Sequence, residues 1–193
     1  MARCDSKAEI SFIKDAVIPN LHDGIWPTEV SAKLSALRHE RVRQPIIYVG
    51  VTTSSIVAGA LKTRSAIEQY LDDYSVDADV ICVGSHGLCS LEPIVEVQMP
   101  GRTRVAFANV TPERVNSILD GALNGFIQPE NTIFQYYSEI HEPWHGIPFK
   151  NELPFFKRQN RVLLKNAGII CPDSIAEYIA HGGYSALAKS IRK

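Results

Sequence analysis

The 193-residue sequence predicts an α/β fold: a core with the order β-α-β-β-β-α, preceded by a helical leader and followed by a helical extension. Three observations predict this core. Two apolar runs rich in β-branched residues, 46–51 and 79–83, are typical of buried strands. The helical period of 56–71 separates these runs. Two short strand-like segments around the turn at Pro100 and Gly101 then predict a hairpin, and a last helix follows it.

The helical leader covers residues 1–44. After Thr28, apolar residues recur at helical spacing and form one face of a helix: Val30, Leu34 and Leu37. Pro45 follows the leader and ends this helix. Because an amphipathic helix buries its apolar face, we expect the leader to pack on another part of the chain.

The core domain covers residues 45–125, and a loop of small residues follows each of its first two strands. These loops are 52–55 and 84–93. In open α/β layers, binding sites lie at the carboxyl ends of neighbouring strands, so we expect a site at these two loops. The last helix of the core begins with Thr111 as its cap and Pro112 in its first position, which is a favourable helix start.

The composition excludes several classes of protein. The chain has 20 Lys and Arg, 21 Asp and Glu and a formal charge of −1, so it has neither a nucleic-acid footprint nor a polybasic membrane patch. No apolar run reaches the length of a membrane span, and charges interrupt the N-terminus where a secretory signal would be apolar. We expect a cytoplasmic protein with no nucleic-acid partner and no direct membrane insertion.

The four cysteines, at positions 4, 82, 89 and 171, are scattered and form no CxxC pair. In a reducing compartment this pattern favours free thiols over disulfides. Cys82 lies between Ile81 and Val83 in an expected strand, where core packing accounts for it. Cys89 differs from Cys82 because it lies in the loop after that strand.

Several short motifs follow one another along the core in a fixed order. They are Ile46 to Gly50, Ile56 to Ala60, the G-x-H-G-L-C run from Gly84 to Cys89, Glu92-Pro93, and Pro100-Gly101 followed by Asn109 to Glu113. Together they resemble the thioredoxin-like 2Fe-2S ferredoxin domain at the start of the flavoprotein subunit of NAD(P)H-linked hydrogenases and of relatives of respiratory complex I. The resemblance implies a thioredoxin-like fold for residues 45–125.

Residues 154–193 resemble the start of the flavoprotein domain of the same family. The matching segments are Pro154 to Gln159, Arg161 to Ile170, Pro172 to Ala180 and Gly182 to Ala188. In the family, the segments that bind FMN, NAD and a 4Fe-4S cluster come later, so the resemblance implies a truncated domain that binds none of them by itself. Local spacing also predicts a helix from about 173 with one apolar face: Ile175, Tyr178 and Ile179.

The resemblance also gives the positions of the cluster ligands. In the family, four cysteines hold the 2Fe-2S cluster, two as C-x4-C after the first strand and two as C-x3-C after the second. The matching positions here are Gly50, Ser55, Ser85 and Cys89. A serine hydroxyl is not deprotonated at neutral pH and glycine offers no ligand, so we expect no stable cluster. Cys89 is the one candidate ligand that remains.

Two further groups of residues suggest a metal. His86 is in principle a ligand, but the family accepts histidine at this position, which favours a structural or exposed side chain. His141, Glu142 and His145 lie close together within the segment 126–153, which is rich in proline and aromatic residues. Because no distant third ligand is evident, a linker that docks its aromatic residues on a neighbour is the favoured interpretation.

Three hypotheses for the function remain open. The first is a non-catalytic component of an NAD(P)H-linked oxidoreductase complex, of the NADH dehydrogenase or NAD(P)-reducing hydrogenase type, whose ferredoxin-like domain docks without a cluster. Its partners would be flavoprotein, hydrogenase or ferredoxin-type subunits. The second is an active iron–sulfur electron carrier with unusual ligation, and the third is a thioredoxin-fold module for protein interactions. The first is favoured, because the family motifs persist while three of the four ligand positions have lost their thiols.

Overall fold

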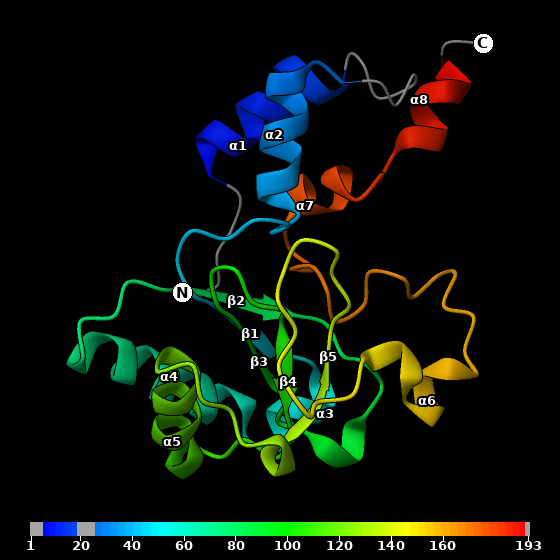
Figure 1. Ribbon diagram of the computed structural model, residues 1–193. Helices are drawn as coiled ribbons and strands as arrows, with labels where there is room; N and C mark the ends of the chain where they lie inside the picture. Colours follow the sequence, from blue (N-terminus) through cyan, green and yellow to red (C-terminus); the bar gives the residue numbers. More distant parts are fainter. Residues whose placement is uncertain (1–5, 19–25, 192–193) are drawn as a thin grey trace. The chain divides into compact units, whose positions relative to one another are not determined.

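The structure, a computed structural model, describes residues 6–18 and 26–191 (Figure 1). The chain divides into two compact units. The core unit spans 42–169, and the helical unit combines 1–41 with 170–193. Within the described residues, no helix is long and apolar enough to cross a membrane.

A five-stranded sheet organises the core unit. Its strands are β1 (Ile46–Gly50), β2 (Asp79–Val83), β3 (Val95–Gln98), β4 (Val105–Phe107) and β5 (Thr132–Gln135). They lie in the order β2-β1-β3-β4-β5. β1 pairs in parallel with β2, placing Tyr48 opposite Ile81, and antiparallel with β3, placing Tyr48 opposite Glu96. The pairs β3–β4 and β4–β5 are antiparallel.

Three helices complete this topology: α3 (Thr53–Val57), α4 (Ala60–Asp73) and α5 (Pro112–Leu123). The chain follows the order β1, α3 and α4, β2, β3, β4, α5, and this order with its strand pairing is the thioredoxin-like arrangement. The predicted fold class is confirmed. One detail differs, because α3 begins inside the expected loop 52–55 and Gly59, with φ +105°, separates α3 from α4.

Helices α4 and α5 lie side by side against one face of the sheet (Figure 1). Their apolar stripes supply Ile67, Tyr70 and Leu71 from α4 and Val115, Ile118 and Leu119 from α5 to the main core. The strands contribute residues that alternate along their length, such as Val95 and Val97 of β3. Burial of these side chains is the main force that holds the core unit together.

The other face of the sheet is covered by the chain that follows α5. Phe156 of α6 (Pro154–Lys157) packs with Ile94 just before β3, Ala106 of β4 and Phe134 of β5. The segment 126–153, expected as a linker, contains the strand β5, which no sequence pattern predicts. It also includes two short 3-10 helices, η4 (Pro129–Asn131) and η5 (Lys150–Glu152). The predicted domain boundaries themselves remain a prediction.

The helical unit contains α1 (Lys7–Phe12), the π-helical turn η1 (Ile13–Val17), α2 (Thr28–Leu37), α7 (Ile175–Ala180) and α8 (Ser185–Ile191). Its core joins both ends of the chain, with Ile13, Val17 and Leu34 packed against Ala176, Ile179 and Ala180. The prediction of the apolar face of α7 is partly wrong. Ile175 and Tyr178 are exposed, and Ala176 and Ala180 are buried instead. The helical leader and the helical extension are both present.

Candidate functional site

The loops after β1 and β2 meet around Glu92. Gly50, at the end of β1, and Ser85, after β2, line one small depression with Glu92. The Ser85 hydroxyl donates to Glu92 Oε1 at 3.2 Å, and a Cβ placed on Gly50 would lie 3.6 Å from Glu92 Oε2. The remaining space is too narrow for a water molecule. Burial raises the pKa of Glu92, and hydrogen bonds from the Ile94 N–H and Ser85 oppose this only in part.

The other two matched positions do not line this depression. Ser55 is buried in α3, where its hydroxyl accepts from the Thr52 N–H at 2.7 Å and donates to the Thr52 carbonyl at 3.0 Å. Thr52 and Ser55 form a capping box, which turns the expected loop into the first turn of a helix. Cys89 is exposed at the start of a short 3-10 helix, η3 (Cys89–Leu91).

The side chains at these four positions do not fit a 2Fe-2S cluster, which normally takes four thiolates. They offer one exposed thiol at Cys89, two hydroxyls engaged in hydrogen bonds within the protein, and a glycine. Over the described ranges, no group of three or more His, Cys, Asp or Glu is arranged to hold a metal ion. A ligand role for Cys89 stays a prediction.

The thiols provide a direct check on this geometry. Cys89 is exposed, whereas Cys82 and Cys171 are buried, and burial raises the pKa of Cys82. Because a buried thiol is shielded from the reagent and the thiolate is the reactive form, we expect Cys82 and Cys171 to react with a maleimide at least about tenfold more slowly than Cys89. Cys4 lies outside the described residues. The labelling rate of Cys89 is therefore obtained by comparing the native chain with Cys89→Ser, which keeps Cys4. Peptide mapping that places the fast label on Cys82 would contradict the structure.

A cluster of charged side chains lies buried beside the depression. Glu96, in the middle of β3, is 1% exposed and contacts His86 and Arg104. Its Oε1 lies 2.5 Å from His86 Nε2, and its Oε2 accepts a hydrogen bond from Arg104 Nε. Burial alone would raise the pKa of Glu96, but Arg104 and His86 more than offset this and lower it to about 2. Glu96 is therefore ionised throughout the neutral pH range.

Lys150 and Tyr136 complete the cluster, and the contacts of Lys150 define the protonation state and tautomer of His86. Lys150 Nζ lies 3.1 Å from His86 Nδ1 and donates to the Tyr136 hydroxyl at 3.2 Å. Burial lowers the pKa of Lys150 to about 8, so at pH 7 it is mainly an ammonium group, which only donates. His86 Nδ1 must then accept, and Nε2 carries the hydrogen that is donated to Glu96. These contacts fit one neutral tautomer of His86.

This arrangement predicts a pH dependence of stability. Burial lowers the pKa of His86 below its ordinary value of 6.5, and Lys150 and Arg104 act in the same direction against Glu96. The unfolded chain therefore takes up the proton first as the pH falls through 6.5, so the stability contributed by neutral His86 is complete above that pH and decreases below it. We expect His86→Gln to have a smaller fall in melting temperature than the native chain between about pH 7.5 and 5.

The difference between the native chain and His86→Gln isolates the contribution of His86 to the pH dependence of stability. Glu92, whose raised pKa favours the folded state at low pH, is present in both and cancels in the comparison. Differential scanning calorimetry at matched ionic strength gives the melting temperature of each protein at several pH values, and thus the slope of melting temperature against pH for each. Equal slopes for the native chain and His86→Gln would contradict a buried, neutral His86.

Arg104 connects this cluster to a distant part of the chain. Its guanidinium donates to the carbonyl of Gly168 at 2.8 Å and to that of Ile169 at 3.2 Å. The same guanidinium lies 3.4 Å from the centre of the Tyr48 ring. The Arg104 guanidinium thus contacts both the Tyr48 ring and the carbonyls of Gly168 and Ile169. These contacts hold the last residues of the core unit against the sheet.

The loop after β2 is held from the same direction. Arg161 donates to the His86 carbonyl at 2.9 Å. Gly168, with φ +78°, lies against the His86 ring so closely that an added Cβ would be 2.1 Å from His86 Cε1. The G-x-H-G-L-C motif is therefore fixed by protein contacts on its histidine.

The residues weighed as a possible metal group, in 141–145, have other contacts or are exposed. Glu142 forms an ion pair with Arg102 at 2.8 Å. Trp144 is buried, and its Nε1 donates to the Thr103 carbonyl at 2.9 Å. His145 is exposed. Trp144 therefore holds this segment against the core of the same unit, and docking of aromatic residues on a neighbour stays a prediction.

The sequence patterns do not identify the charged cluster. Alternation over 94–99 is typical of a strand with one face in solvent, yet every residue of β3 is buried. One signal was available: Glu96 and Arg104 lie on opposite sides of a short hairpin, where opposite charges pair. Lys150 and Tyr136 come from the segment expected as a linker, and no pattern places them at the site.

No family model matches the sequence. Among solved structures, the chain is similar to a thioredoxin-like 2Fe-2S ferredoxin from Aquifex aeolicus, with 17% identity over 50% of this chain and 96% of that chain and a TM-score of 0.42. A structure of the wild-type form of that ferredoxin matches with 17% identity over 48% of this chain and 98% of that chain, at a TM-score of 0.39. The thioredoxin-like fold of this chain is defined by its own strand order and pairing.

Proposed function

We propose that the chain is a component of an NAD(P)H-linked electron-transfer oxidoreductase complex, of the NADH dehydrogenase or NAD(P)-reducing hydrogenase type, in which the thioredoxin-like core unit docks and does not carry electrons. Its partners in this proposal are the flavoprotein, hydrogenase or ferredoxin-type subunits of that complex. The chain does not catalyse a reaction alone, and FMN, NAD and the 4Fe-4S cluster are held outside it.

The observation that carries this proposal is the state of the four matched ligand positions. Gly50 and Ser85 lie at the carboxyl ends of two parallel strands, but the Glu92 carboxyl group lies between them. Ser55 uses its hydroxyl to cap α3, and Cys89 faces solvent. The backbone setting resembles a cluster site, while the side chains form a hydrogen-bonded polar site. This combination supports a role in docking over a role in electron transfer.

Iron analysis tests the proposed loss of the cluster. After anaerobic reconstitution with iron and sulfide, we expect the purified chain to bind well below one iron per molecule and to show no broad visible absorption. A chain that binds about two irons and is coloured would support the second hypothesis, an active carrier with unusual ligation. Cys89→Ser is the control, because iron that persists in this variant is not bound at the candidate site.

Association tests the proposed role in a complex. The chain and an FMN-binding flavoprotein subunit of the complex are produced together, and we expect them to copurify and to form a complex by analytical ultracentrifugation. Docking in such complexes is expected to be detectable at micromolar concentration or below. A chain that remains monomeric with every flavoprotein, hydrogenase and ferredoxin-type subunit tested would leave the third hypothesis, an interaction module without a redox partner.

A further inference from the structure

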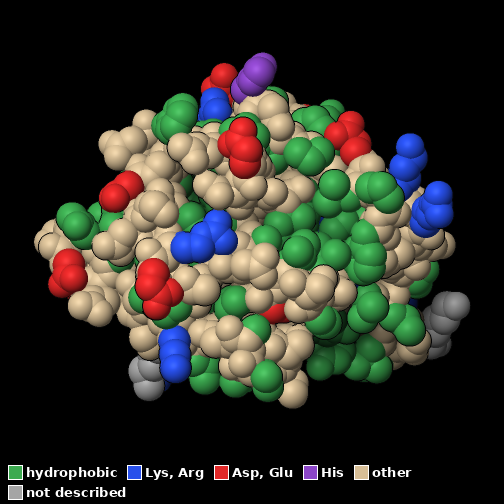
Figure 2. Space-filling view, turned by 90° about the horizontal axis from the view of Figure 1, so that it is seen from below, with side chains coloured by type: hydrophobic (Ala, Val, Ile, Leu, Met, Phe, Trp, Pro, Cys, Tyr) green, Lys and Arg blue, Asp and Glu red, His purple; other side chains and the backbone are tan. Residues whose placement is uncertain are grey.

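The core unit exposes an apolar run that nothing in the described core unit covers. Val162, Leu163 and Leu164 are consecutive and are 68%, 95% and 60% exposed, and Phe155 is 43% exposed. Isolated exposed apolar residues are common, but a contiguous group of large ones marks an interaction site. Figure 2 shows hydrophobic side chains gathered on the right of the face that is seen from below, the side on which α6 lies in Figure 1.

The same segment is strongly basic. Lys157, Arg158, Arg161 and Lys165 lie within it, and no acidic residue occurs between Glu152 and Asp173. The chain as a whole is balanced, with 20 basic and 21 acidic residues, so this local excess is a specific feature of the segment. Lys157, Arg158 and Lys165 are exposed. We refer to residues 155–165 as the basic apolar surface.

This surface is held in place by contacts at its base. Phe156 is 7% exposed and packs with Phe134, and Arg161 donates to the His86 carbonyl at 2.9 Å. Phe155 lies against the loop after β2, where a Cβ on Gly87 would be 3.6 Å from its ring. A surface that is ordered before binding loses less conformational entropy in the complex.

We propose that the basic apolar surface is the docking face of the chain for its flavoprotein partner, and that the partner presents an apolar patch rimmed by Asp and Glu. This inference rests on the proposed function. Val162, Leu163 and Leu164 form the apolar centre of the contact, and the basic residues around them pair with the acidic rim. Charge selects this occupant over a symmetric second copy, because two basic apolar surfaces that face each other would bring like charges together.

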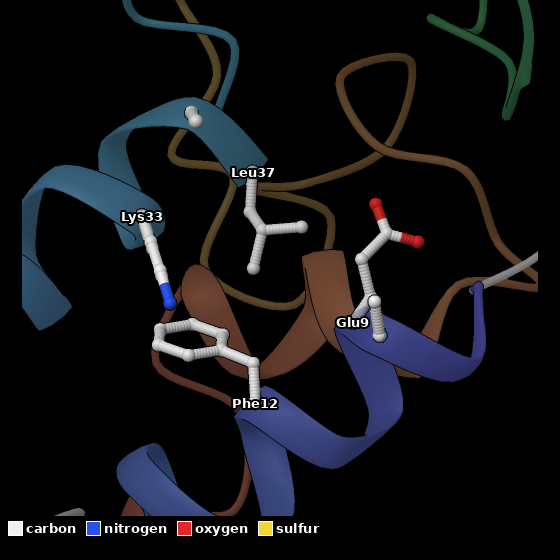
Figure 3. Close-up of a pocket in the computed structure, with 6 residues that line it drawn as sticks. Glu9, Phe12, Lys33 and Leu37 are labelled. Atoms are coloured by element: carbon white, nitrogen blue, oxygen red, sulfur yellow. The ribbon is translucent and has the colours of Figure 1, made fainter.

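Another pocket, in the helical unit, is a weaker candidate for a binding site. Phe12, Lys33 and Leu37 line an opening of about 280 Å³ between α1 and α2, with Lys33 Nζ 5.0 Å from the centre of the Phe12 ring (Figure 3). It has one basic group at its edge and no buried polar group directed into it among its lining residues. It specifies no ligand, so no site is assigned to it.

The experiment measures binding of the full chain to the purified flavoprotein subunit by biolayer interferometry at low and high salt. We expect the double variant Val162→Ser with Leu163→Ser to weaken binding by about tenfold or more, because large apolar residues at the centre of a contact dominate its affinity. We expect Lys157→Glu with Arg158→Glu to weaken binding at low salt and to reduce its salt dependence. Phe126→Ser is the matched control, since Phe126 is also 68% exposed but lies after α5.

Each outcome separates the docking face from the proposed function. If the native chain binds the flavoprotein and all variants bind equally well, the docking face is wrong and the proposed function stands. If no flavoprotein binds the native chain, both are wrong. Binding to phosphatidylcholine vesicles with about one third phosphatidylserine, lost only in the surface variants while flavoprotein binding is kept, would identify a lipid and overturn the proposal. A homodimer lost in Leu163→Ser would overturn it in favour of a second copy.

Discussion

Replacing Glu96 by glutamine is expected to destabilise the core unit by about 3–5 kcal/mol. Glu96 is 1% exposed and its carboxylate is the negative partner of Arg104, which is itself 8% exposed. Glutamine keeps the shape of the side chain but leaves the Arg104 charge buried without a counter-charge, and an unpaired buried charge is costly. Urea unfolding in a Trp26→Phe background, where the buried Trp144 is the one tryptophan that fluoresces, measures the loss.

The chain contains a matched control on its surface. Glu142 pairs with Arg102 at 2.8 Å, but the Glu142 side chain is 74% exposed. An exposed pair is screened by water and contributes little, so Glu142→Gln is expected to cost less than about 1 kcal/mol. If the two substitutions have equal effects, the cluster around Glu96 is not the buried charged group that the structure describes.

Removing both charges distinguishes the cost of an unpaired charge from the value of the pair. Replacing Glu96 by glutamine and Arg104 by methionine together is expected to destabilise less than the sum of the two single variants. The Gly168 and Ile169 carbonyls still lose their donor in the double variant, because Arg104 supplies it. Some destabilisation should therefore remain, of about 1 kcal/mol or more.

The periodicity of the sequence predicts the sheet and its helices because one physical cause dominates there. The strands at 46–50 and 79–83 are apolar throughout or nearly so, and the stripe through Val115, Ile118 and Leu119 marks the buried face of α5. Prediction fails where a distant segment changes the environment. β3 has both faces buried because His86 and Tyr136 enclose Glu96 on its second face, and contacts with residues distant in sequence leave no periodic signal.

The candidate site was predictable only in its position. The resemblance places Gly50, Ser55, Ser85 and Cys89 at two loops, and the structure brings Gly50 and Ser85 together at one depression. It does not predict that Ser55 caps a helix, because a capping box depends on the backbone conformation as well as on residue type. The Glu92 carboxyl was also missed, since nothing local distinguishes a buried glutamate from an exposed one.

Gly168→Ala is the second substitution with a large expected effect, of about 2–4 kcal/mol. Two costs add. An L-residue at φ +78° adopts the left-handed region, and the new Cβ would lie 2.1 Å from Cε1 of a histidine that cannot easily move. The His86 ring is held by Glu96 on one nitrogen and Lys150 on the other, so relieving the clash means disturbing the charged cluster.

Gly101→Ala separates these two costs. Gly101 has φ +76°, nearly the same conformation, but an added Cβ there meets no atom within 4 Å. It carries only the backbone cost, about 1–2 kcal/mol. The excess loss in Gly168→Ala over Gly101→Ala therefore measures how firmly His86 is held. Equal losses would mean that the His86 ring yields freely, and the fixed neutral histidine on which the pH dependence relies would be wrong.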